Sequence, residues 1–201
     1  MTDKFRIKER GFTVLELGIV VLLIGIVAAI SLPRITEAMR EYRLNSGMRQ
    51  ITDLLKRAKM QAVSANQRAA LSVDLAGRRV GMTFYNDDNT VNRIEWAPLP
   101  SGISFERPIS ITSNPEGVTT QEVLSFGQED GVYRLAFNSR GFPVVAFGET
   151  SAIFVGNGRD YRAVTMSSVG GVRTYRAENS TWVNTRRTYE STTETEPEED
   201  E

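Results

Sequence analysis

The sequence predicts an α+β fold, in which one long N-terminal helix packs on a small antiparallel β domain. Residues 12–32 are almost wholly apolar, and residues 33–66 keep apolar side chains at helical spacing. From 67 to 176 the pattern changes to short runs rich in β-branched and aromatic residues, separated by turn-forming residues. We therefore expect a leader at 1–11, a transmembrane helix at 12–32, an amphipathic helix at 33–66, the β domain at 67–176 and an acidic tail at 177–201.

The composition restricts the chemistry of the chain. Its 201 residues contain no cysteine and no histidine. Disulfides and thiolate metal sites are excluded, and the commonest general base near neutral pH is missing. We therefore expect a protein that is not an enzyme and holds no metal or cofactor. The net charge of -1 is unevenly placed, because residues 1–11 hold four basic and two acidic residues, whereas 177–201 hold two basic and eight acidic ones.

The apolar run at 12–32 has the length of a membrane span. As a helix it extends about 32 Å, close to the hydrocarbon thickness of a bilayer. Basic residues precede it, so the positive-inside rule keeps the N-terminus in the cytoplasm. A plain membrane anchor fits this length, whereas the run is longer than the usual apolar core of a removable signal peptide. Neither explains Glu16, because a carboxylate in a membrane helix costs up to about 2.5–3.5 kcal/mol.

The stretch GFTVLE at 11–16, after a short basic leader, resembles the class III signal of type IV prepilins and type II secretion pseudopilins. The resemblance implies that a prepilin peptidase cleaves between Gly11 and Phe12 and methylates Phe12. It also implies that Glu16 pairs with the amino-terminal charge of a neighbouring subunit in the filament core, where the pair fixes the register. Pro33 stands where many pilins carry proline, and we expect it to kink the helix.

The helix is expected to continue from about Phe12 to Ser64 and to carry two apolar stripes. The first stripe is expected to face other subunits and consists of Ile35, Ala38, Met39 and Tyr42. The second is expected to pack on the protein's own sheet and consists of Ile51, Leu54, Leu55, Ala58 and Ala62.

The remaining segments predict seven or eight antiparallel strands and two irregular regions. The strand candidates are AALSVDL, RRVGMTFY, VNRIEW, YRLAFN, FPVVAFG, SAIFVGN and YRAVTMSS, with further strand sequence in VGGVRTYR. The stretch from Pro98 to Gln128 is rich in serine, proline, threonine and glycine and predicts a surface loop. Residues 188–201 lack aliphatic side chains and are strongly acidic, so we expect disorder there.

Three of these later segments resemble GspH/FimT-type minor pseudopilins. They are LLKRAKMQAVSANQRAALSVDL, RLAFNSRGFP with Phe137 and Gly141, and YRAVTMSSVGGVRTYR. The resemblance implies a structural subunit of a type II secretion pseudopilus or a type IV pilus, in a priming or tip complex. It implies a single-pass protein of the bacterial inner membrane with a periplasmic C-terminal domain. The implied partners are other pilin subunits, the prepilin peptidase, the inner-membrane assembly platform and membrane lipid.

The final strand sequence departs from that family. The family typically ends in Gly-Arg-x-Arg, whereas this chain has Gly170-Gly171-Val172-Arg173. Some competence-associated members bind DNA through arginines in this region, which makes Arg173 and Arg176 candidate contacts of a DNA-binding minor pilin for DNA uptake. Phosphate binding needs several clustered cations, and an acidic tail follows these two arginines, so DNA is not the favoured partner.

An enzymatic function and a calcium site are two further possibilities. A membrane-anchored periplasmic enzyme would need two carboxylates that converge in a pocket. A calcium site is conceivable at Asp87-Asp88 or Glu129-Asp130, but two neighbouring carboxylates fall short of the six to eight oxygen ligands that Ca²⁺ takes.

Overall fold

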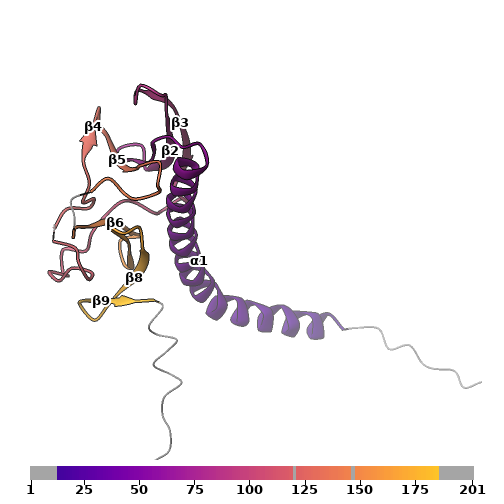
Figure 1. Cartoon of the computed structure of the whole chain (residues 1–201). Coiled ribbons are helices and arrows are strands. Elements are labelled where there is room, and N and C mark those ends of the chain that lie inside the picture. The colour runs from indigo at the N-terminus through magenta and orange to yellow at the C-terminus, as the bar shows by residue number, and fades with distance from the viewer. Residues whose placement is uncertain (1–12, 120, 146–147, 186–201) are drawn as a thin grey trace, which may run out of the picture. The chain divides into compact units, whose positions relative to one another are not determined.

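The computed structural model describes residues 13–119, 121–145 and 148–185, and the side chains of 31–33 lie outside the description. Within these residues the chain forms one helix, α1 (Val14–Ser64), followed by strands β1 to β9 (Figure 1). It divides into two compact units within α1, between Met39 and Arg40. The predicted α+β class is confirmed, and α1 ends at the predicted residue.

The end of α1 has a local cause. Asn66 adopts a left-handed backbone with φ of 51°. The amide of Gln67 donates to the carbonyl of Ala62 at 3.2 Å, and the amide of Asn66 donates to that of Val63 at 3.2 Å. These two bonds form a Schellman motif, which satisfies carbonyls that the helix leaves unpaired. The chain then turns directly into the first strand.

The strands form two antiparallel sheets. The five-stranded sheet has the order β3-β2-β1-β5-β4, with bounds Val91–Pro98, Arg79–Tyr85, Ala69–Asp74, Val132–Phe137 and Gln128–Glu129. The four-stranded sheet has the order β6-β7-β8-β9, with bounds Thr150–Gly156, Tyr161–Ser167, Val172–Glu178 and Thr181–Asn184.

One hydrophobic core joins the second half of α1 to both sheets. The helix contributes a buried stripe of Leu44, Met48, Ile51, Leu55, Ala58 and Ala62. Their spacing of three and four residues places them on one helical face. The same cluster holds Leu71 and Val73 of β1, together with Ile153 of β6 and Val164 of β7. The predicted second stripe is therefore confirmed as the core face, with Leu54 partly buried beside it.

A second, smaller core covers the other face of the four-stranded sheet, and it corrects the predicted tail. Trp182 of β9 lies against Phe154, with ring centroids 5.2 Å apart, next to a buried Tyr175. The segment predicted as a tail, 177–201, therefore starts with the last two residues of β8 and then contains β9. The β domain extends to Asn184 because the indole buries apolar surface that offsets the polar composition around it.

Two other expectations need correction. FPVVAFG at 142–148 was expected as a strand, but its described residues make only an isolated bridge between Phe137 and Pro143. Proline has no N–H for a ladder, which limits pairing here. The stretch 98–128 is irregular as predicted, but it is not only surface. Ile103 and Leu124 are buried in the main core, and Val118 is buried in the second core.

Candidate functional site

The first half of α1 presents an apolar surface on every side. The large hydrophobic side chains from Val14 to Ile30 are between 42% and 89% exposed. By length and composition this helix is able to cross a membrane, and no part of its most apolar window is buried in the protein. A soluble domain rarely leaves such a surface uncovered.

Glu16 lies in the first turn of this helix, where Thr13 is the N-cap. The hydroxyl Oγ1 of Thr13 accepts a hydrogen bond from the amide of Glu16 at 3.2 Å, and its carbonyl accepts from the amide of Leu17 at 3.1 Å. Threonine followed three residues later by glutamate is the capping-box pattern. This role of Thr13 was not predicted from the sequence, although the spacing Thr13-x-x-Glu16 contained the signal.

The other predicted processing residues lie outside the described part of the chain. Gly11 and Phe12 are in this group, so cleavage between them and methylation of Phe12 stay predictions. The backbone of α1 is helical through residue 33. The side chain of Pro33 is not described, and the expected kink there also stays a prediction.

Arg173 and Arg176, the candidate DNA contacts, are not brought together. Both lie on β8, where successive side chains alternate between the sheet faces. Arg173 shares its face with Tyr175 of the second core, whereas Arg176 lies on the opposite face. Nη1 of Arg173 contacts Oε2 of Glu116 at 2.7 Å, and Nε of Arg176 contacts Oε1 of Glu178 at 3.0 Å. DNA binding by the pair stays a prediction with little geometric support.

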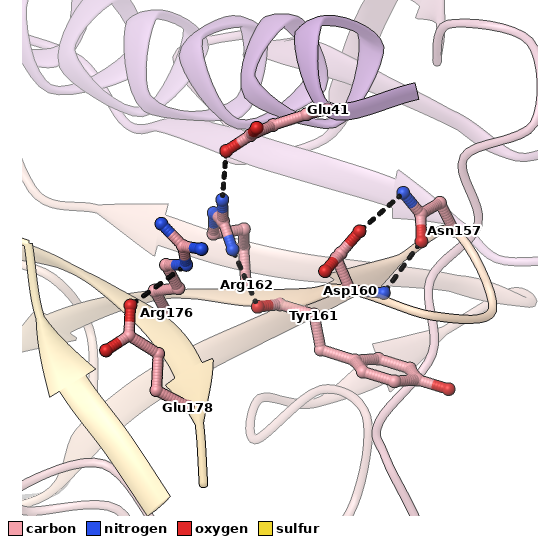
Figure 2. A network of polar contacts seen from close by, with 7 residues as sticks. All are labelled: Glu41, Asn157, Asp160, Tyr161, Arg162, Arg176 and Glu178. Atoms are coloured by element: carbon pink, nitrogen blue, oxygen red, sulfur yellow. Dashed lines mark hydrogen bonds and ion pairs between the residues drawn. The ribbon is translucent and has the colours of Figure 1, made fainter. Parts of the chain in front are cut away.

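The structure places a different arginine at the boundary between helix and sheet. Arg162 of β7 has a side chain only 7% exposed, and Nη2 lies 3.5 Å from Oε1 of Glu41 on α1 (Figure 2). Directly opposite it in the β7–β8 ladder is Arg176. Burial lowers the pKa of Arg162, Arg176 lowers it further, and Glu41 acts in the opposite direction. A 3.5 Å contact with a half-exposed carboxylate leaves this buried charge only partly compensated.

A hollow of about 480 Å³ opens beside Arg162. It is lined by Asn45, Met48, Arg49, Thr52, Asp53 and Lys56 of α1, and by Arg162, Thr174 and Thr185 of the sheet side. We call it the basic groove. Asp53 is the only carboxylate among the described residues of this lining.

The acidic pairs considered for calcium are occupied by local contacts. Oδ1 of Asp88 accepts from the amide of Thr90 at 2.9 Å, and Oε2 of Glu129 contacts Nη1 of Arg134 at 2.8 Å. The described residues contain no group of three or more acidic side chains placed to hold a metal ion.

No family model and no curated protein sequence matches the chain. The structure is similar to the type IV minor pilin FimU of Pseudomonas aeruginosa, with a TM-score of 0.45, 13% identity and coverage of 71% of this chain and 94% of that one. It is also similar to the minor pseudopilin EpsH of the type 2 secretion system of Vibrio cholerae, with a TM-score of 0.42, 15% identity and coverage of 64% and 92%. Likeness at this level of identity says nothing of function.

Proposed function

We propose that the chain is a minor pilin or pseudopilin, a structural subunit of a type II secretion pseudopilus or a type IV pilus, and that it performs no catalysis. One observation carries the proposal: a single carboxylate, Glu16, in the first turn of an apolar helix that the protein itself leaves exposed. A plain anchor needs the apolar side chains but no carboxylate among them.

The helix has two successive environments in this proposal. It first holds the subunit in the bacterial inner membrane by a single pass, with the N-terminus in the cytoplasm and the β domain in the periplasm. It then packs among the helices of other subunits, where apolar side chains stay out of water. The exposed side chains of Ile35 and Met39 extend this surface beyond the membrane. The prepilin peptidase and the assembly platform are the further partners that the proposal requires.

Glu16 gains a partner when the leader is removed. Cleavage between Gly11 and Phe12 leaves an amino group near the start of α1, and Glu16 of one subunit pairs with that of its neighbour. Breaking a buried ion pair by removing one member costs about 3–5 kcal/mol, because the other charge stays uncompensated. The pairing therefore selects one register among the many that apolar packing alone permits.

The test separates this charge from the capping role that Thr13 and Glu16 share. Glutamine also fits a capping box, so Glu16→Gln keeps the helix start and removes the charge. We expect normal leader removal, seen as a mass shift of the membrane-bound protein, with incorporation into sheared filaments reduced at least about tenfold. Thr13→Ala weakens the cap by about 1 kcal/mol and keeps the charge, so its incorporation should stay close to wild type.

Two results would contradict this role of Glu16. Normal incorporation of Glu16→Gln would show that the charge is not needed. Equal losses in Glu16→Gln and Thr13→Ala would assign the effect to the helix start instead.

DNA uptake is the second candidate function, and the geometry favours it less. Arg173 and Arg176 lie on opposite sheet faces, and each contacts a glutamate. Replacing both with glutamine should therefore change salt-dependent DNA binding of the full chain in detergent by less than the roughly tenfold loss expected when clustered phosphate contacts are removed. A larger loss would restore DNA uptake as a function of this chain.

A further inference from the structure

Among the described residues that line it, the basic groove carries three cations and one carboxylate. Arg49 and Lys56 line it from α1 and have no carboxylate partner among the described residues. From Arg40 to Ser64 the helix holds six basic and two acidic residues. The sheet side adds Arg162, a buried guanidinium whose Nη2 lies 3.5 Å from Oε1 of Glu41 and whose Nη1 donates to the carbonyl of Tyr161 at 3.4 Å (Figure 2). The groove therefore offers cations, with few anions to balance them.

The shape of the groove suits an extended chain. Its helical wall runs from Asn45 to Lys56, which is roughly 17 Å at about 1.5 Å per residue. An extended segment of about five residues covers that length at about 3.3 Å per residue. Asn45 adds a side-chain amide that can donate to a carboxylate.

The end of the last strand lies at the wall of this groove. Thr185 follows β9, and its amide donates to the carbonyl of Thr174 at 3.0 Å. Thr174 and Thr185 both line the groove. The residues that follow are Arg186 and Arg187, and then TYESTTETEPEEDE at 188–201, which holds seven acidic residues and no basic ones. An acidic segment therefore begins two residues after the chain leaves the wall of a basic groove.

We propose that residues 188–201 bind in the basic groove of their own chain, with their carboxylates beside Arg49, Lys56 and Arg162. Single exposed ion pairs contribute only about 0.2–1 kcal/mol each. A short tether, however, gives an effective concentration in the millimolar range. Binding at about 1 mM corresponds to about 4 kcal/mol. Three such pairs contribute up to about 3 kcal/mol, and a hydrogen bond from the Asn45 amide to a carboxylate adds about 1.5–3 kcal/mol. The tail then neutralises the groove in the free subunit, and an acidic surface of another protein must displace it to bind there.

This inference does not depend on the proposed function, because it concerns only the unit from Arg40 onward. We call this unit, which holds the second half of α1 and both sheets, the β-domain unit. The test is zero-length carbodiimide cross-linking of the full chain in detergent, which joins a carboxylate to an ammonium group in direct contact. Lys56 lines the groove, whereas the Nζ of Lys59 lies 3.5 Å from the carbonyl of Gly170. Trypsin separates the two, since Lys56 falls in peptide 50–57 and Lys59 in peptide 58–68. Lys59 is therefore the internal control.

We expect peptide 188–201 to be joined mainly to peptide 50–57, and within one chain when ¹⁵N-labelled and unlabelled protein are mixed. The yield should fall between about 0.1 M and 1 M salt, because the screening length shortens from about 10 Å to about 3 Å. Arg49→Gln should lower the yield about two- to fivefold, the equivalent of one exposed ion pair. Arg57→Gln, a change on the same helix outside the groove lining, should leave the yield unchanged.

Three results would overturn the proposal. Equal yields at Lys56 and Lys59 would show random encounters of the tail. Mixed links, between labelled and unlabelled peptides, that are as frequent as uniform ones would place the tail in another subunit. A yield that is insensitive to salt and to Arg49→Gln would exclude the charge pairing.

Discussion

Replacing Leu55 with alanine should lower the free energy of unfolding of the β-domain unit far more than replacing an exposed residue on α1. Leu55 is 1% exposed and lies in the cluster that joins the helix to both sheets. Its loss leaves a hole bounded on one side by the helix backbone and on the other by two hydrogen-bonded sheets. Such walls relax little, so the loss of transfer free energy is accompanied by a cavity cost.

The expected cost is large on the scale of this unit's stability. Buried leucine-to-alanine changes cost about 2–5 kcal/mol, and rigid surroundings favour the middle or upper part of that range. Met60→Ala is the matched control, because Met60 is 70% exposed on the same helix. A surface change of this kind typically alters the free energy of unfolding by less than about 0.5 kcal/mol.

The assay is urea unfolding of the full chain in detergent, followed by tryptophan fluorescence. Both tryptophans, Trp96 and Trp182, lie on strands of the β-domain unit, so the signal does not report on the apolar half of the helix. With a slope of about 2 kcal/mol/M, a loss of about 3 kcal/mol lowers the midpoint by about 1.5 M. If Leu55→Ala shifts the midpoint no more than Met60→Ala does, the joint core of helix and sheets is refuted.

Two further predictions concern a turn and a carboxylate. Gly141 has φ of +78°, and a Cβ there would lie 2.8 Å from Cγ2 of Val63. Gly158 has a similar φ of +82°, but a Cβ there would meet nothing within 4 Å. Gly141→Ala should therefore destabilise the fold more than Gly158→Ala. Urea midpoints of the two variants check this, and equal losses would show that the steric contact is unimportant. Hydrogen bonds from the amide of Gly77 and then from the guanidinium of Arg79 lower the pKa of Asp74 in the folded state. The ionised carboxylate therefore stabilises the fold fully at pH values above its unfolded pKa of about 3.9. This stabilisation is lost as the pH falls through the lower pKa of the folded state. Asp74→Asn should therefore cost about 0.5–1 kcal/mol near pH 7, and this cost should shrink as pH falls below about 3.9 in the same assay. A cost that does not change with pH would contradict the linkage.

The helix was predictable because its signal is periodic and local. The spacing of Ile51, Leu55, Ala58 and Ala62 identifies the core face from the sequence alone. Its approximate end at Ser64 also followed from the change of period after Asn66.

The strands were less predictable at the edges of the sheets. β4 consists of two residues in a hairpin with β5, which is too short for any alternation to be visible. β9 lies in an acidic, polar stretch, and its place depends on the packing of Trp182 against Phe154. FPVVAFG has the composition of a strand, yet Pro143 limits its pairing to an isolated bridge.

The candidate site was predicted only where one short motif contains it. Glu16 stood out because it interrupts an apolar run, whereas the cap at Thr13 was missed although its spacing was visible. The contact between Glu41 and Arg162 joins residues 121 positions apart. Sequence pattern alone cannot bring such residues together, since the pairing depends on how the helix packs on the second sheet.

The most direct test of the central claim is the N-terminal sequence and intact mass of the protein recovered from membranes of its own host. A mature chain that begins at Phe12 and is heavier by one methyl group is the predicted result, because it follows from processing at Gly11 and makes Glu16 an assembly residue. An uncut N-terminus would leave a simple membrane anchor, and a start near residue 32 would mean an ordinary signal peptide. Either of these two results would contradict the proposal of a pilin or pseudopilin.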